Sequence, residues 1–112
     1  MSTLRNKVQL IGCLGNNPTI VVTEKGVKRA RFALATNETH RNANGTRVTE
    51  TQWHTLIAWG KLADIAEKYL FKSREIAVEG KLSNRSYTDK QGNKRYISEV
   101  VVAEIILLRT TS

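Results

Sequence analysis

The sequence predicts an all-β protein, a partly open five-stranded Greek-key barrel with one short α-helix between the third and fourth strands. Two observations predict this fold. Five stretches alternate apolar and polar residues with the period of a strand, and one stretch between the third and fourth repeats its apolar residues at helical spacing. Because 112 residues can bury one core but not two, we expect residues 1–112 to form a single domain.

The first two predicted strands end at turn signals. Residues 7–15 alternate, and Asn16-Asn17-Pro18 closes them as a turn. In residues 27–37 three apolar side chains share one face, Ala30, Phe32 and Leu34. Arg29 and Arg31 fall on the other face, so the second strand has a basic outer surface.

The third strand follows an exposed connection. Residues 38–47 are polar and contain Asn44-Gly45, which is a strong hairpin signal. We therefore expect this segment to lead across the surface into a third strand at residues 48–59.

In the second half of the chain the spacing of the apolar residues changes twice, first to that of a helix and then back to that of a strand. Residues 62–71 repeat apolar side chains at helical spacing and predict an amphipathic helix without a clear N-cap. Strand alternation returns in residues 75–87, and a turn at residues 89–93 leads into a fifth strand at 96–108. Three apolar side chains, Ile76, Val78 and Leu82, share the inward parity of the fourth strand, and residues 105–108 are expected to be buried on both sides. We expect these elements to form a barrel of the OB type, because such a barrel leaves few strand edges exposed.

The charge of the chain indicates a polyanionic partner. Eighteen Lys and Arg residues oppose ten Asp and Glu residues, which gives a net charge of +8. Nucleic acid and an acidic membrane surface both fit this charge. The sequence has no apolar run that could span a bilayer, no signal-peptide pattern after Met1 and one cysteine, so we expect a cytoplasmic protein without membrane association.

Both tryptophans of the chain lie in the third strand. Because strand residues an even number apart point the same way, Trp53 and Trp59 share a face, opposite Leu56 and Ala58. If Leu56 faces the core, both indole rings face outward. The alternative, in which the rings belong to the core, stays open at this point.

The fourth strand repeats this combination, because Tyr87 shares its outer face with Lys81 and Arg85. Exposed rings beside cations are what base stacking on single-stranded nucleic acid needs, and each stacked base contributes roughly 1–3 kcal/mol. Arg29 and Arg31 supply further positive charge. For each cation taken alone, an ordinary solvated surface charge is the simpler interpretation.

Several stretches resemble the DNA-binding domain of the bacterial single-stranded DNA-binding protein, and together they cover nearly the whole chain. They are NKVQLIGCLGNNP, RFALATNE, TQWHTLIAWGKLADIAEKYL, IAVEGKL and YTDKQGNKRY. The most specific is the Trp-His pair followed by an apolar run into Trp-Gly-Lys-Leu-Ala. The resemblance implies an OB-fold, usually assembled as a homotetramer. It also implies sequence-tolerant wrapping of single-stranded DNA in replication, recombination and repair, in a nucleoid-associated protein of the cytoplasm.

The resemblance also implies roles for individual residues. The family stacks bases at four places, which correspond here to Trp53, Trp59, Tyr87 and His40. The position of His40 more often carries a larger aromatic, so the resemblance implies weaker and pH-dependent stacking there. His54 matches a family histidine associated with the subunit interface, although an ordinary core or surface histidine is the alternative.

Two features of the sequence depart from the family pattern. Family members continue through a flexible linker into an acidic tail that recruits replication and repair enzymes, whereas this sequence ends with Leu108-Arg109-Thr110-Thr111-Ser112. We expect either a truncated chain or a tailless paralogue, and the missing acidic tail fits the charge of +8. Ser73 stands where a glycine commonly ends the family's helix.

Other function classes fit the sequence less well. The chain offers no metal-ligand spacing, nucleophile motif or phosphate loop, so we expect no enzyme, cofactor or metal. A primosomal-type OB-fold paralogue that mainly docks replication proteins is the alternative, although such a module has no need for a set of stacking rings. A cold-shock-like RNA-binding role is a third possibility, but the early strands carry only Phe32 as an aromatic.

Overall fold

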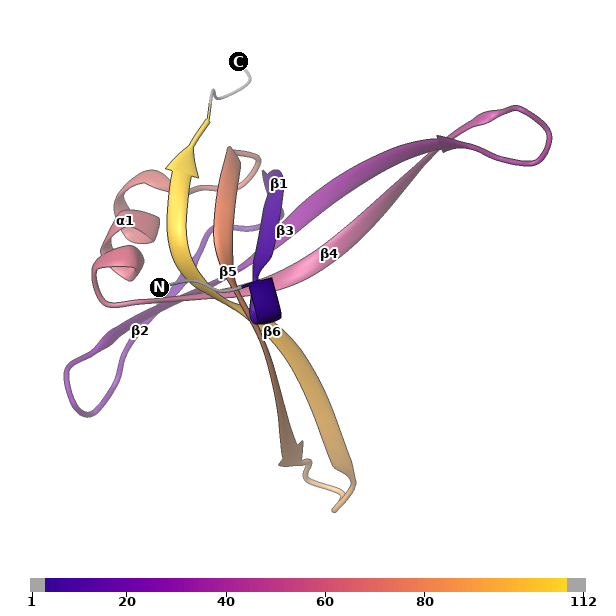
Figure 1. Ribbon diagram of the computed structural model, residues 1–112. Coiled ribbons are helices and arrows are strands. Elements are labelled where there is room, and N and C mark those ends of the chain that lie inside the picture. Colours follow the sequence, from indigo (N-terminus) through magenta and orange to yellow (C-terminus); the bar gives the residue numbers. More distant parts are fainter. Residues whose placement is uncertain (1–3, 109–112) are drawn as a thin grey trace.

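The computed structural model of this protein describes residues 4–108 (Figure 1). A 3-10 turn, Leu4–Asn6, precedes six strands and one α-helix. The strands are β1 (Val8–Leu14), β2 (Thr19–Val22), β3 (Lys28–Arg41), β4 (Arg47–Trp59), β5 (Glu75–Thr88) and β6 (Lys94–Leu107), and the helix α1 (Lys61–Tyr69) connects β4 to β5.

The strands close into a barrel. Five of them follow the order β1-β5-β6-β4-β3, and β1 returns to β3 through the pairs Cys13–Ala35 and Leu14–Leu34. All neighbours are antiparallel except β4 and β6, which pair in parallel at Leu56–Val100. This closed five-stranded barrel with one helix before the fourth of its strands confirms the predicted Greek-key OB-fold. The short strand β2 is an addition that the sequence pattern did not predict, and it extends the sheet beyond β3.

The core follows the predicted alternation of β3 and β4. Its four largest fully buried side chains are Phe32, Leu34, Leu56 and Ile76. Helix α1 packs on β3, β4 and β6 and contributes its buried alanines, Ala63 and Ala66. The helix begins after Gly60 without a side-chain cap, as its sequence suggested. It ends in a turn where Ser73, at φ 78°, adopts the left-handed backbone that favours glycine.

Two hairpins extend beyond the barrel as arms (Figure 1). In the β3–β4 arm the strands pair as far as Arg41 and Arg47, so residues 38–41, predicted as part of a connection, are strand. In the β5–β6 arm they pair as far as Thr88 and Lys94. The arms give the molecule extents of 54 × 40 × 30 Å.

Three side chains predicted to be buried are exposed instead. Leu82 keeps the inward parity of β5, but it lies where the strand leaves the barrel and is 45% exposed. Ile106 and Leu107, in the segment predicted to be buried on both sides, are 51% and 37% exposed. The prediction was wrong for Ile106 because only one face of a barrel strand faces its core.

Candidate nucleic-acid interface

The outer face of β3 and β4 carries the two tryptophans beside two arginines. In this antiparallel pair Trp59 lies opposite Arg29, and Trp53 lies opposite Ala35, on the same face of the sheet. The neighbouring residues Leu56 and Ala58 are fully buried, while Trp53 is 62% and Trp59 42% exposed. The indole rings therefore face outward, as the alternation predicted.

Trp53 rests on the backbone of the turn that follows β1. A Cβ atom at Gly15 would collide with Cζ3 and Cη2 of the indole ring. This turn is fixed to β3, because the Gly15 amide donates to the Ala33 carbonyl at 2.9 Å and Asn16 Oδ1 accepts from the Ala33 amide at 3.0 Å. The absence of a side chain at Gly15 thus lets one part of the ring lie on the protein while the rest faces solvent.

The central groove of this face consists of two shallow depressions that share Arg29 and Arg31. One, of about 320 Å³, crosses from β3 and β4 to β5 and β6 and also contains Trp59, Ser83, Arg85 and Glu99. The other, of about 390 Å³, continues past Thr55 to Asn16 and Thr19. The structure therefore brings together four residues predicted for the site, Arg29, Arg31, Trp59 and Arg85.

The charges of the central groove fall into two kinds. Arg85 is paired: its Nε donates to Glu99 Oε1 at 2.9 Å, and this hydrogen bond raises the pKa of the Arg85 guanidinium above its usual value. Glu99 is only 6% exposed, so its carboxylate forms part of the floor. Arg29 and Arg31 make no ion pair with any described residue, and Nε of Arg29 has no hydrogen-bond partner there. Their positive charge is available to an anion in the groove.

Other predicted residues lie outside the central groove. Lys81 is exposed on the same face of β5. Tyr87, 49% exposed, lies farther along this face on the β5–β6 arm, opposite Arg95. These two residues place a cation and a ring along an outward continuation of the groove.

The two histidines lie on the face of β3 and β4 opposite to Trp53. His40 is exposed on the β3–β4 arm, with its Nε2 3.7 Å from a carboxylate oxygen of Glu50. His54 is half-buried, and its Nε2 lies 2.9 Å from Thr36 Oγ1. The structure therefore does not bring His40 into the same surface as Trp53, although both belong to one hairpin.

Sequence reasoning missed Tyr96 as an exposed ring. Tyr96 is 75% exposed on the β5–β6 arm, and Lys94 Nζ lies 5.6 Å from the centre of its ring. The signal was present in the sequence, since a tyrosine two residues after a lysine at the start of a strand resembles the Tyr87 region. It was overlooked because the apolar residues farther along β6 indicated a buried strand.

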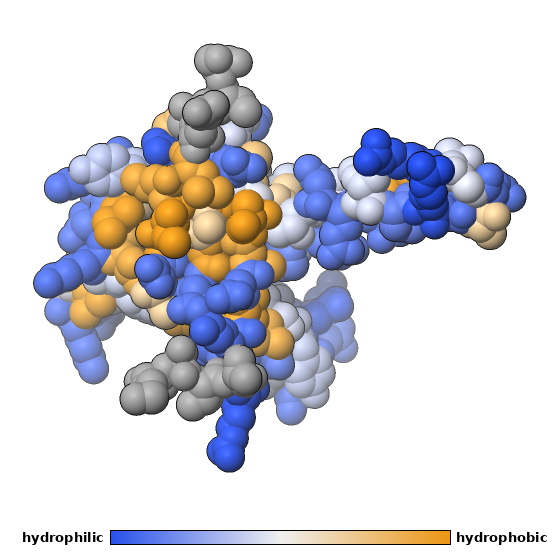
Figure 2. Space-filling view, turned by 45° about the horizontal axis from the view of Figure 1, so that its top comes forward, coloured by the Kyte–Doolittle hydropathy of each residue, from blue (hydrophilic) through white to orange (hydrophobic). Residues whose placement is uncertain are grey.

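A second outer face of the barrel is apolar. Ile11 of β1 lies opposite Ala77 of β5, which lies opposite Ile106 of β6, and the row borders a hollow of about 450 Å³. Figure 2 shows the apolar surface gathered on the barrel, whereas the β3–β4 arm is mostly hydrophilic. In this part of the sheet β1 has a free edge, because its described pairs with β3 are limited to Cys13 and Leu14.

The described residues show little sign of other kinds of site. No grouping of three His, Cys, Asp or Glu side chains in residues 4–108 could hold a metal ion. The only α-helix described, α1, is too short and too polar to cross a membrane.

The topology of the barrel and its one helix define an OB-fold protein, and the groove adds rings and cations on one outer face. Comparison with known sequences identifies the family: the chain belongs to the Single-strand binding protein family, which matches residues 5–108. This is a family of binding proteins, so the chain is not an enzyme.

Named relatives agree with this assignment. The chain is 44% identical over 104 residues to "Single-stranded DNA-binding protein 1" of Chlorobaculum tepidum and 39% identical over 104 residues to the protein of that name of Xylella fastidiosa. It is 41% identical over 105 residues to "Single-stranded DNA-binding protein" of Bacteroides thetaiotaomicron. Each match covers 92% of this chain, which spans 64%, 76% and 65% of the lengths of these relatives, respectively.

A solved structure, "Plasmodium falciparum SSB complex with ssDNA", has the same fold. It superposes on this chain with a TM-score of 0.89 at 31% sequence identity, and the match covers 97% of this chain and 99% of that one.

Proposed function

We propose that this chain binds single-stranded DNA without sequence preference and protects it during replication, recombination and repair. The observation that carries the proposal is the central groove, where Trp59 and the outward-facing Trp53 share a surface with Arg29 and Arg31. Membership in the Single-strand binding protein family and the similarity to a single-strand complex support it.

The mechanism combines two interactions. Unpaired bases stack on Trp53 and Trp59, and the guanidinium groups of Arg29 and Arg31 neutralise the phosphates between them. Arg85, whose charge is balanced by Glu99, offers its remaining N–H groups to a phosphate. Every base has a flat face, so stacking tolerates any sequence. In a duplex the bases already stack on one another and are not available, so the groove discriminates against double strands.

The arms extend the same mechanism beyond the groove. Tyr87 offers a further ring, and Lys81 a further cation, along the outer face of β5. His40 lies on the reverse face of the β3–β4 arm, so a strand that stacks on it has to pass around this arm. This path accords with wrapping of the DNA around the protein rather than with a single straight channel.

Intrinsic fluorescence tests the proposal, because both tryptophans belong to the site. The chain is titrated with oligo-dT and with a duplex of equal length at two salt concentrations. We expect strong quenching by the single strand alone, and weaker binding at the higher salt because the release of condensed counterions into more concentrated salt gains less free energy. Unchanged emission with both nucleic acids would contradict the proposal and favour a primosomal-type protein-docking module.

The first variant to compare is Trp53→Ala. Loss of one stacked base should weaken oligo-dT binding by roughly 1–3 kcal/mol. Because the ring is 62% exposed, the thermal midpoint should change little. A large loss of thermal stability with unchanged affinity would instead assign Trp53 a structural role.

We also propose that the chain forms a homo-oligomer, in the family manner a tetramer, through its apolar outer face. The row Ile11, Ala77 and Ile106 and the free edge of β1 offer a second copy both apolar area and strand pairing. His54 lies near the point where β1 and β3 separate, which suits its proposed place at a subunit interface. Residues 1–112 act as one domain in this proposal, in the cytoplasm at the nucleoid, with replication and repair proteins as further partners.

Light scattering on size-exclusion fractions tests the assembly. Ile106→Lys places a charge at one end of the apolar row and should lower the measured mass while short oligo-dT still binds. A monomeric parent protein, or a variant with the mass of the parent, would contradict this part of the proposal.

A further inference from the structure

The turn after α1 exposes two aromatic rings beside two cations, outside the central groove. We call Tyr69, Phe71, Lys72 and Arg74 the helix-exit patch. Tyr69 is 50% and Phe71 45% exposed, whereas Leu70 between them is 5% exposed and anchors the segment in the core. Half-exposed rings next to an anchored residue form a fixed surface rather than a loose loop.

Arg74, itself held by a hydrogen bond, contacts the Phe71 ring. Arg74 donates from Nη1 to the Tyr69 carbonyl at 3.2 Å, and its guanidinium carbon lies 5.6 Å from the centre of the Phe71 ring. The guanidinium thus sits within cation–π range of the ring. A ring held in this way, and still half exposed, can present a flat surface to a ligand.

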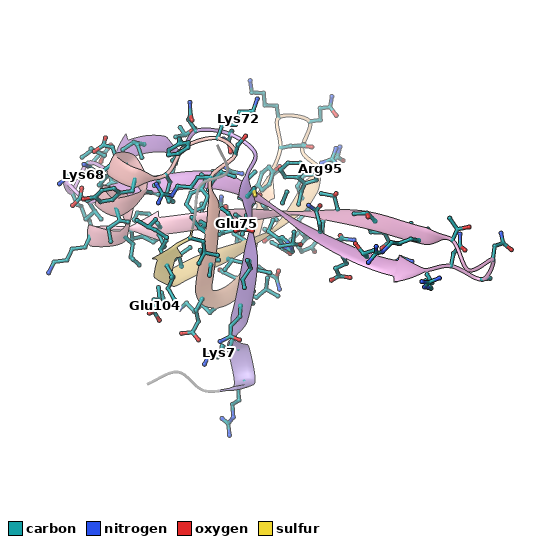
Figure 3. All side chains as sticks on the ribbon, turned by 90° about the horizontal axis from the view of Figure 1, so that it is seen from above. Lys7, Lys68, Lys72, Glu75, Arg95 and Glu104 are labelled. Carbon is teal, nitrogen blue, oxygen red and sulfur yellow. The ribbon has the colours of Figure 1, made fainter. Side chains whose placement is uncertain are left out.

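The charge of the segment selects an anionic ligand. Residues 68–74 include three cations, Lys68, Lys72 and Arg74, and no carboxylate. The nearest acidic residues of α1, Asp64 and Glu67, are held by Lys28 at 2.8 and 2.7 Å. Figure 3 shows Lys72 on the opposite side of the view from Lys7 and Glu104.

Hydrogen bonds from backbone amides connect this patch to the turn on which Trp53 rests. The Lys72 amide donates to Asn17 Oδ1 at 2.9 Å, and the Ser73 amide donates to the Leu14 carbonyl at 2.8 Å. Between these two anchor points lies Gly15, on which the Trp53 ring rests. The turn of residues 15–17 therefore contacts the Trp53 ring and also the backbone of the helix-exit patch.

We propose that Phe71 is a further stacking position for single-stranded DNA, with Lys72 and Arg74 neutralising the adjoining phosphates. A strand that leaves the central groove at Trp53 crosses the turn of residues 15–17 and places a base on Phe71. This inference rests on the proposed function and adds a position beyond the groove. It accordingly predicts that Phe71 matters only for strands longer than the groove holds.

A ladder of oligo-dT lengths tests the proposal, spanning about 4–16 nucleotides, the range of site sizes for one OB-fold. Phe71→Leu keeps apolar bulk and removes the ring, whereas Phe71→Tyr keeps the ring and serves as the matched control. We expect Phe71→Leu to equal the parent on the shortest strands and to bind the longest about tenfold more weakly. Phe71→Tyr should equal the parent at every length.

A fluorescent reporter gives a second readout that does not depend on affinity. Phe71→Trp is placed in a chain with Trp53→Phe and Trp59→Phe, so that emission comes from residue 71 alone. Emission should be quenched only by strands above the length at which Phe71→Leu begins to lose affinity.

The outcomes separate this inference from the proposed function. Loss of binding in Trp53→Ala, with Phe71→Leu equal to the parent at all lengths and an unquenched reporter, would overturn the inference and leave the groove intact. No effect of Trp53→Ala at any length would overturn the proposed function itself. Quenching of the reporter by polyglutamate but not by oligo-dT would show that the patch binds acidic protein segments, and would also overturn the inference.

Discussion

Gly15 controls the position of Trp53, because a side chain there would occupy the space of the indole ring. We expect Gly15→Ala to turn the ring away and to weaken oligo-dT binding by about 1–3 kcal/mol, the contribution of one stacked base. Titrations of the variant, with the emission maximum of the free protein recorded alongside, measure this effect.

A double-mutant cycle supplies the control for Gly15. If the glycine acts through the ring, Gly15→Ala should cost little further affinity in a chain that already carries Trp53→Ala. Additive losses would show that Gly15 contributes in another way, for example through the turn itself.

Ser73 holds a left-handed backbone conformation at φ 78°, where a Cβ atom is unfavourable. We expect Ser73→Gly to stabilise the fold by about 1 kcal/mol, since the relief of strain exceeds the added entropy of the unfolded chain. The thermal midpoint should rise by a few degrees, with DNA binding unchanged. An unchanged or lower midpoint would mean that the serine side chain stabilises this turn by as much as the strain costs.

At the scale of residues, the sequence predicted which face a side chain points to better than it predicted how exposed that side chain is. The outward orientation of Trp53 and Trp59 follows from period-two alternation alone, because Leu56 and Ala58 mark the inner face. The exposure of Leu82 and Phe71 depends on where a strand leaves the barrel and where a helix ends. Both positions are set by long-range packing, which local periodicity does not contain.

Helix α1 is connected to the barrel by ion pairs as well as by its buried alanines. Lys28 of β3 contacts Asp64 and Glu67, which raises the pKa of Lys28 to about 12 and lowers the pKa of Asp64 below 3.8. The coupling between proton binding and folding gives the direction in which each group changes stability with pH. The stabilisation of the folded state by Asp64 is fully present above pH 3.8 and is lost as the pH falls through the lower pKa that Asp64 has in the folded protein. The stabilisation by Lys28 is fully present below pH 10.5 and is lost as the pH rises through about 12.

We therefore expect the thermal midpoint of the parent to exceed that of Asp64→Asn at neutral pH, by an amount that shrinks as the pH falls below about 4. Calorimetry of both proteins across this range measures the difference. Lys61→Gln, an exposed position on the same helix that forms no ion pair with any described residue, is the matched control and should show no such convergence. A difference independent of pH would show that the ion pair contributes nothing.

At the scale of elements, the arms were the part that the sequence described least well. Residues 38–41 carry no apolar alternation, because an arm without a core on either side does not require one. Their pairing relies on backbone hydrogen bonds and on polar cross-strand contacts, such as that of Thr51 Oγ1 with Asn37 Oδ1 at 2.7 Å. A polar strand and a polar loop look alike in sequence, and the Asn44-Gly45 turn alone does not show how far pairing extends.

At the scale of the whole molecule, the groove arginines should set the salt dependence of binding. Each phosphate neutralised on a single strand contributes about 0.7 to the slope of log affinity against log salt. Arg31→Gln should therefore reduce the slope by about 0.7, with little change in thermal stability because Arg31 is exposed.

Lys25→Gln provides the comparison for Arg31, since Lys25 is an exposed cation in the β2–β3 turn, outside the central groove. Titrations at four or more salt concentrations should give this variant the slope of the parent. Equal slopes for the parent and Arg31→Gln would mean that Arg31 faces no phosphate.

The closure of the barrel could be predicted from the sequence because it follows from the order of elements. Three strands, a helix and a hairpin leave few ways to cover every strand edge. Assembly could not be predicted in the same way. The row Ile11, Ala77 and Ile106 forms only when β1, β5 and β6 lie side by side, and the sequence gives no indication that these residues are neighbours.

The two arms also imply an entropic cost of binding. The radius of gyration is 16.0 Å, whereas a compact chain of this length would have about 13 Å. Beyond the barrel each arm is a two-stranded ribbon with almost no apolar burial, so it can open and close locally while the core stays folded. Amide hydrogens near the arm tips should then exchange with deuterium far sooner than those of the barrel. A DNA strand that engages an arm has to immobilise it, and part of each added contact is offset by that loss of motion.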